Sequence, residues 1–341
     1  MTIDLRSDTF TMPSREMLET ILTAKLGDDV WREDPTVIEL ETLAAKKLGK
    51  EAGLLVTSGT QGNLCSIMTH LNRGDGIVLE AECHTYLYEA GGITSVVGAY
   101  PFLIKGKNGV MDPKDVEKIV TRPYNVHFVQ AKLLCLENTH NTGGGKVIPK
   151  ENIDALAKIA HENEVVVHID GARIFNAAVA SGTPASKLVE NADSVQMCLS
   201  KGLGCPIGSL IVGTEEFIQK ARKNRKIVGG SMRQAGIIAA PGIYALNNMI
   251  DRLAEDHMHA KLIANELEKI PNIQLRPVET NLIIADLSKS KWTAPGIAKK
   301  FENKGIKVSL MGEYLFRMVT YLNISRSDIN TVVATIPEVF Q

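Results

Sequence analysis

Residues 165–173 read Val-Val-Val-His-Ile-Asp-Gly-Ala-Arg, an apolar run that ends on an acid followed by small residues. A buried strand of a parallel sheet has this pattern where it passes into a helix. Amphipathic helical patterns follow other such runs, as at 152–162, where apolar residues fall on one stripe, and after Asp112-Pro113, which opens a helix. Strands alternating with helices predict a doubly wound α/β domain. The other predicted strands are residues 53–56, 76–79, 126–129, 133–136, 194–198 and 209–212.

The pattern changes after Asp251, so we predict a large domain over residues 1–250 and a small C-terminal α+β domain over residues 251–341. The small domain is predicted to begin with a long helix over 251–270. The rest of it reads as a strand at 281–287, a helix at 297–304, strands at 307–310 and 315–320, and a helix at 327–339.

Composition excludes several classes of protein. A net charge of −1 gives no electrostatic footprint for nucleic acid, and no apolar stretch is long enough to span a membrane. The five cysteines are scattered without a CxxC pair, which argues against a disulfide framework or a metal site and favours a reducing compartment. Residues 1–6 lack the apolar core of a signal sequence, so we expect a cytoplasmic enzyme or binding protein.

Two residues predict the chemistry. Lys201 lies among small and apolar residues, 31 positions after Asp170. A lysine with few polar neighbours tends to have a lowered pKa and a nucleophilic amine, and an aspartate at a strand end can pair with a ring nitrogen. Together they predict a Schiff-base lysine and a pyridinium partner for pyridoxal 5′-phosphate (PLP). Taken singly, each has an ordinary explanation as a surface lysine or a helix cap.

Other polar residues follow predicted strands, where ligands of α/β sheets bind. Ser58, Gly59, Thr60 and Gln61 form a turn before a helix, where free N–H groups could hold a phosphate. His84 could stack on a cofactor ring, and Arg173 could reach a ring oxygen or a substrate carboxylate.

The order of several motifs closely resembles that of the threonine aldolases, PLP enzymes of the aspartate-aminotransferase-like fold. The resemblance runs from residue 4 to about residue 323. Its motifs are RSDT at 6–9, GDDV at 27–30 with EDPT at 33–36, residues 58–63, LENTHN at 136–141, HIDGAR at 168–173, SKGL at 200–203 and MRQ at 232–234.

The resemblance implies retro-aldol cleavage of β-hydroxy-α-amino acids, such as L-threonine or L-allo-threonine, to glycine and an aldehyde. It implies a homotetramer, a dimer of dimers with sites between subunits. The roles it implies are Lys201 for the Schiff base, Asp170 for the ring nitrogen, His84 for ring stacking, Gly59, Thr60 and Gln61 for the phosphate, Ser7, Arg173 and Arg317 for the substrate carboxylate, His127 near the substrate hydroxyl, and Lys226 and Arg233 towards a neighbouring subunit's phosphate.

The sequence departs from the family pattern at two places: Trp31-Arg32 replaces Tyr-Gly, and Tyr321 and Asn323 replace a histidine and an aspartate after Arg317. These changes bear on substrate preference and on the support of Arg317.

Another PLP lyase, an aminotransferase or a non-catalytic PLP-binding protein is an alternative that the sequence leaves open. A nicotinamide dehydrogenase is disfavoured because the GxGxxG fingerprint is absent.

Overall fold

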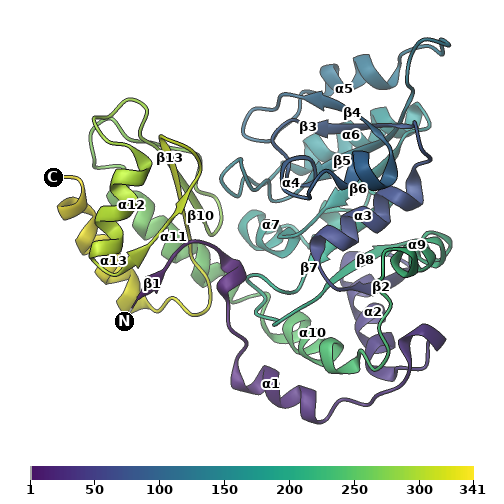
Figure 1. Cartoon of the computed structure of the whole chain (residues 1–341), viewed down its shortest axis with the longest axis horizontal. Helices are drawn as coiled ribbons and strands as arrows, with labels where there is room; N and C mark the ends of the chain where they lie inside the picture. Colours follow the sequence, from purple (N-terminus) through teal and green to yellow (C-terminus); the bar gives the residue numbers. More distant parts are fainter. Residues whose placement is uncertain (1) are drawn as a thin grey trace.

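The computed structural model describes residues 2–341, and its centre is a seven-stranded sheet between layers of helices (Figure 1). All neighbouring strands are parallel except β8, which runs antiparallel to both β2 and β7. This confirms the mostly parallel sheet predicted from the sequence. The strand order is β2 (Ala52–Val56), β8 (Ser209–Gly213), β7 (Ser194–Cys198), β6 (Val166–Asp170), β5 (Ala131–Glu137), β3 (Gly76–Glu80) and β4 (Tyr100–Ile104).

Apolar side chains cover both faces of this sheet, because successive residues of a strand point to opposite sides. In β5, Leu134 and Leu136 join the main core, while Leu133 and Cys135 join the core that contains Ile67 of the helix α3. The helices of this part are α1 (Arg15–Leu22), α2 (Pro35–Leu48), α3 (Gly59–His70), α4 (His84–Leu87), α5 (Pro113–Val120), α6 (Lys150–Glu162), α7 (Ile174–Ser181), α8 (Ala185–Leu188), α9 (Glu215–Ile227) and α10 (Gly236–Asn248).

The C-terminal part has its own core around an antiparallel sheet. The sheet order is β12 (Ser309–Leu310), β13 (Leu315–Val319), β10 (Leu282–Asp286) and β9 (Gln274–Leu275). Its helices are α11 (Leu253–Leu267), α12 (Ala294–Asn303) and α13 (Arg326–Val339). Most of these elements agree with the pattern predicted after Asp251, and the helix expected from 251 is shorter at both ends. The strand β9 was not predicted, and the strand expected at 307–310 is divided between β11 (Ile306–Lys307) and β12.

The N-terminal residues pack with this C-terminal part rather than with the large sheet (Figure 1). The strand β1 (Ile3–Asp4) pairs in parallel with β11 (Ile306–Lys307), and Ile3 and Leu5 are buried in the C-terminal core. The two-domain division predicted from the sequence remains a proposal, and it should group these first residues with residues 251–341.

One predicted strand is wrong. Residues 126–129 lie in an exposed loop, and the next strand begins only at Ala131. The Asn125 side chain accepts a hydrogen bond from the backbone N–H of His127, which fixes a turn, and Phe128 packs under the guanidinium of Arg122 instead of entering a core. The edge strand β4 was not predicted.

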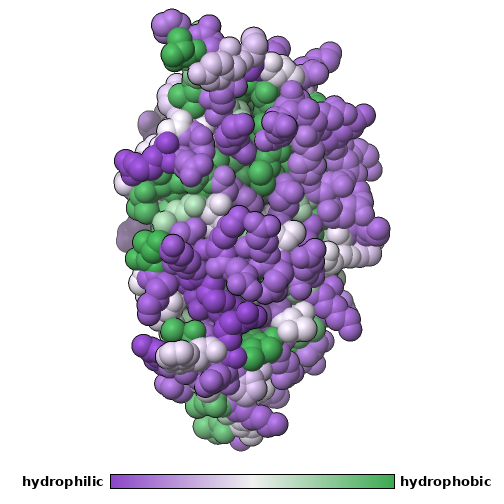
Figure 2. Space-filling model, turned by 90° about the vertical axis from the view of Figure 1, so that its right-hand side faces the viewer, coloured by the Kyte–Doolittle hydropathy of each residue, from purple (hydrophilic) through white to green (hydrophobic). Residues whose placement is uncertain are grey.

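The surface is mixed in character. Figure 2 shows one face as mainly hydrophilic, with apolar residues gathered in a few patches. Across residues 2–341, no helix has the combination of length and apolar character that crossing a membrane requires.

Candidate active site

A cavity of about 160 Å³ lies where β6 and β7 end, and five of the residues singled out in the sequence line it: Gly59, Thr60, His84, Asp170 and Lys201. Its other lining residues are Asn63, Glu89, Ala172, Gln196, Cys198 and Ser200. The carboxyl ends of neighbouring parallel strands bring these side chains together although they are far apart in the sequence.

Asp170 is buried at the end of β6 and is surrounded by donors. Its Oδ2 accepts hydrogen bonds from the Asn63 side-chain amide (2.9 Å) and from Thr85 Oγ1 (3.3 Å), and its Oδ1 accepts one from the Ala172 N–H (3.1 Å). These are the partners of an ionised carboxylate, the form that a protonated pyridine nitrogen requires.

The turn at Ser58 fits a phosphate. Ser58 caps α3 by accepting a hydrogen bond from the Gln61 N–H (3.2 Å). The N–H groups of the first two helical residues, Gly59 and Thr60, have no carbonyl acceptor within the helix and can therefore bind an anion. A Cβ on Gly59 would lie 2.8 Å from Cys198 Sγ, so only glycine keeps the backbone this close to the cavity. The Gln61 side chain turns back to accept hydrogen bonds from Thr57.

His84 begins α4 and is held through both its backbone and its ring. Its backbone N–H donates to Glu137 Oε2 (2.7 Å), and its Nδ1 lies 3.0 Å from Glu89 Oε1. Burial opposes a charge on the imidazole, but Glu89 and Asp170 outweigh it and raise the pKa of His84. A ring nitrogen of His84 and a carboxylate oxygen from each of Glu89 and Asp170 lie within 4.8 Å of one another.

Arg173 is committed to another residue of the protein. Its Nε and Nη2 donate to the two carboxylate oxygens of Asp8, both at 2.7 Å, and the pair is buried. Asn281 also donates to Asp8 (3.2 Å). Burial would raise the pKa of Asp8, but Arg173 more than offsets it and holds that pKa well below its usual range.

Burial of the guanidinium lowers the pKa of Arg317, and repulsion by the positive charge of Arg173 lowers it further. Its terminal nitrogens donate to Asn141 Oδ1 and to the Arg6 carbonyl, both at 3.1 Å. Its Nε is buried and finds no hydrogen-bond partner within residues 2–341. Two arginines with Asp8 as the paired carboxylate leave a net positive site suited to an anion. Ser7 caps the turn that carries Asp8.

Eight of the predicted residues do not line this cavity in the single chain: Ser7, Ser58, Gln61, Arg173 and Arg317, described above, and His127, Lys226 and Arg233. His127 is in the exposed loop, and Lys226 is exposed near the end of α9. Arg233 is exposed and donates to Asp28 Oδ2 (3.0 Å).

Tyr321 and Asn323, which depart from the family pattern, form their hydrogen bonds with the N-terminal segment and not with Arg317. Tyr321 donates to the Asp4 carbonyl (2.8 Å), and Asn323 Oδ1 accepts from the Met12 N–H (2.6 Å). Trp31 is 73% exposed, and Arg32 is in a left-handed conformation (φ 60°).

Sequence reasoning missed Asp8, Asn63, Glu89 and Glu137 as site residues. Asp8 and Glu137 stood inside the quoted motifs RSDT and LENTHN, and the acidic residue in each motif was the available signal. Asn63 also stood inside a quoted motif, residues 58–63, but its partners come from distant segments, and Glu89 had no signal in the sequence.

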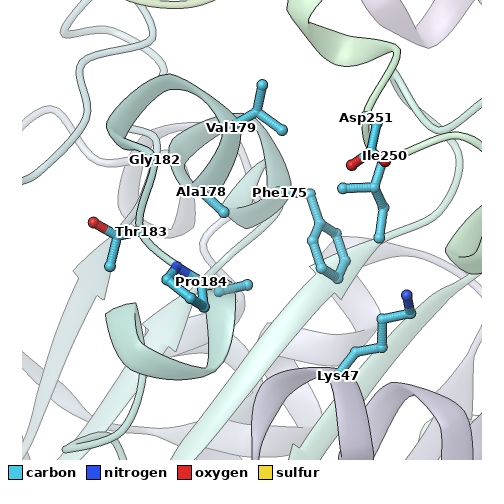
Figure 3. A pocket seen from close by; sticks show the side chains of 10 residues that line it. Lys47, Phe175, Ala178, Val179, Gly182, Thr183, Pro184, Ile250 and Asp251 are labelled. Atoms are coloured by element: carbon cyan, nitrogen blue, oxygen red, sulfur yellow. The ribbon is translucent and has the colours of Figure 1, made fainter.

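A separate cavity of about 460 Å³ lies between α7, α8 and the turn at Ile250 (Figure 3). Its lining is mostly apolar, with Lys47 and Asp251 as its charged members, and it holds none of the predicted site residues. The smaller cavity is therefore the candidate site.

Comparisons with known proteins identify the family and the fold of this chain. A family model described as beta-eliminating lyase matches residues 4–290. The chain is 43% identical over 334 residues to low-specificity L-threonine aldolase 1 of Arabidopsis thaliana, covering 96% of this chain and 93% of that protein. Its fold matches a Leishmania major threonine aldolase structure (TM-score 0.86, 17% identity, 99% and 100% covered). It also matches a structure of SPT with PLP (TM-score 0.78, 17% identity, 99% and 87% covered).

Proposed function

We propose that this chain, which belongs to the beta-eliminating lyase family and within it to the threonine aldolases, cleaves L-threonine and L-allo-threonine to glycine and acetaldehyde. Other β-hydroxy-α-amino acids would give glycine and the corresponding aldehyde. The observation that carries the proposal is one cavity that holds Lys201, Asp170 and His84 together, with the buried Arg173 and the half-buried Arg317 as nearby positive charges.

The residues of the cavity suit PLP, which when bound draws electrons from a bond at the substrate Cα. Lys201 would hold its aldehyde carbon, Asp170 its ring nitrogen and His84 a face of its ring. The start of α3 would hold its phosphate, since Gly59 allows the close approach that a Cβ would block.

Arg317 and Ser7 orient the substrate in this proposal. The unpartnered Nε of Arg317 is a charged donor for the substrate carboxylate. Arg173, whose Nε and Nη2 are engaged by Asp8, adds positive charge and fixes the wall of the site. Holding the carboxylate decides which bond at Cα is aligned for cleavage, here the Cα–Cβ bond.

His84 is the base that the geometry favours for the β-hydroxyl proton. When its Nδ1–H donates to Glu89, its Nε2 is free to accept a proton. The exposed position of His127 in the single chain makes it a base only if a neighbouring subunit or a loop movement brings it to a site.

The test is turnover of L-threonine, L-allo-threonine and their D forms by the purified protein with added PLP. Acetaldehyde, detected with alcohol dehydrogenase, should appear from both L forms. No aldehyde from any of the four would overturn the aldolase proposal, and amino transfer to a keto acid would favour an aminotransferase.

Replacing Arg317 with alanine should mainly raise KM for threonine. A charged hydrogen bond contributes about 1.5–3 kcal/mol, so kcat/KM should fall roughly ten- to a hundredfold. Steady-state kinetics on Arg317→Ala, with the exposed Arg326→Ala as control, measures this. An unchanged KM would remove Arg317 from the carboxylate site.

We also infer a homotetramer in the cytoplasm. Exposed apolar side chains lie at the ends of α1, α9 and α10 (Leu22, Ile227 and Ile237) and in the segment between α1 and α2 (Trp31), where a partner could cover them. Lys226 and Arg233 lie in the same region and would then face a neighbouring subunit's phosphate. All five cysteines are buried and unpaired within the described chain, which fits a reducing compartment. Light scattering on the purified protein measures the oligomer.

A further inference from the structure

We propose that a buried chain of hydrogen bonds through Asn63, His168, Ser194 and His70 positions Asp170 as a pure acceptor for the cofactor's ring nitrogen. The chain starts at the cavity, runs between α3 and the neighbouring strands β6 and β7, and ends at His70, the last residue of α3. The inference rests on the role proposed above for Asp170. It assigns four positioning residues, of which only Asn63 lines the cavity.

The contacts fix the orientation of the Asn63 amide. Asn63 Nδ2 lies 2.9 Å from Asp170 Oδ2 and 2.8 Å from Glu89 Oε1. Ionised carboxylates only accept hydrogen bonds, so the NH₂ group must face them. The amide oxygen then faces His168 Nε2 at 3.1 Å, and this nitrogen must carry the hydrogen.

The remaining links follow one after another. A neutral His168 with its hydrogen on Nε2 has a lone pair on Nδ1, which accepts from Ser194 Oγ at 2.8 Å. The Ser194 oxygen in turn accepts from His70 Nε2 at 2.7 Å. Every donor in the chain therefore points towards Asp170.

Both histidines are suited to remain neutral. Burial lowers the pKa of His168 to about 3 and that of His70 to about 4. His168 is fully buried in β6, and the His70 ring stacks on Phe217 at 4.6 Å. A charged His168 would carry a hydrogen on Nδ1 as well, so this nitrogen could no longer accept the hydrogen bond from the Ser194 hydroxyl.

The chain matters because Asn63 stands between two carboxylates. Burial and the charge of Asp170 raise the pKa of Glu89, although His84 and Asn63 oppose this. If the amide turned, its oxygen would face Asp170 and Glu89, and one of them would need a proton to relieve the repulsion. A proton kept on Asp170 is a proton withheld from the ring nitrogen.

The experiment reads the ring nitrogen directly. The enzyme is loaded with PLP labelled with ¹⁵N at the ring, and the ¹⁵N chemical shift is followed against pH. In His168→Phe the pH at which half of the nitrogen is protonated should fall by about one to two units, as expected for a lost hydrogen bond to a charged system. His168→Gln, whose amide NH₂ can replace the Nε2 donor, should restore most of the wild-type value.

Three further proteins make the result decisive. His259 is also buried and its ring nitrogens lack hydrogen-bond partners among residues 2–341, so His259→Phe is the matched control and should leave the nitrogen unchanged. Ser194→Ala, a smaller change, should give an intermediate shift even if His168→Phe does not fold. Asn63→Leu should give the full effect.

The outcomes separate the two proposals. A neutral ring nitrogen in the wild-type enzyme would contradict the role of Asp170 itself. A protonated nitrogen in the wild type that stays unchanged in Ser194→Ala and in whichever of His168→Phe and Asn63→Leu folds would overturn the positioning chain and leave the aldolase proposal intact.

Discussion

Lys201→Ala should abolish threonine cleavage and the covalent attachment of PLP. Lys201 lies at the cavity that also contains Asp170 and His84, so no other lysine among its lining residues can replace it. We expect kcat to fall about a thousandfold or more, the scale seen when an enzyme loses a covalent nucleophile. Acetaldehyde release measures the activity, and borohydride reduction followed by peptide mass mapping measures the attachment.

The control is Lys223→Ala on the exposed side of α9, which should keep both activity and attachment. A pyridoxyl label that maps to another lysine in the wild-type protein would show that Lys201 is not the attachment site. Retained cleavage by Lys201→Ala would contradict the whole assignment of the cavity.

Asp8→Ala should destabilise the protein by about 3–5 kcal/mol, because it leaves Arg173 charged, buried and without its partner. Urea unfolding monitored by circular dichroism measures this change in the free energy of unfolding. The exposed pair of Asp115 and Lys118 provides the control, and Asp115→Ala should leave the free energy of unfolding nearly unchanged.

The same pair predicts a dependence on pH. The pKa of Asp8 is lower in the folded state than its ordinary value of 3.8, so its stabilisation is complete above that value and is lost as the pH falls towards the folded pKa. The difference between wild type and Asp8→Ala should therefore be constant near neutral pH and narrow only below about pH 4. A difference that already narrows between pH 7 and pH 5 would contradict the buried pair.

The sequence was sufficient for six of the seven strands of the large sheet and for residues at the ends of these strands. Asp170 could be placed because an apolar strand ends on it, and parallel strands bring such ends to one edge. Helix starts such as Asp112 were equally clear, since the side chain accepts from Lys114 as a cap does.

Contacts between distant segments could not be predicted. Arg173 was expected to face a ligand, but Asp8, 165 residues away in sequence, takes its Nε and Nη2. Asn63 looked like an ordinary helix residue because its carboxylate and histidine partners come from other elements. Residues 126–129 had the composition of a strand, and only the tertiary structure shows that no neighbouring strand covers them.

The pairing of β1 with β11 also determines when the site can be completed during synthesis. Ile3 and Asp4 are translated long before their partners Ile306 and Lys307. Asp8 likewise accepts a hydrogen bond from Asn281, which is translated 273 residues later. A nascent chain that has not reached Ile306 would hold the lysine and the main sheet without the strand pairing that anchors the segment before Asp8, so this wall of the site can form only after Ile306 and Lys307 are synthesised.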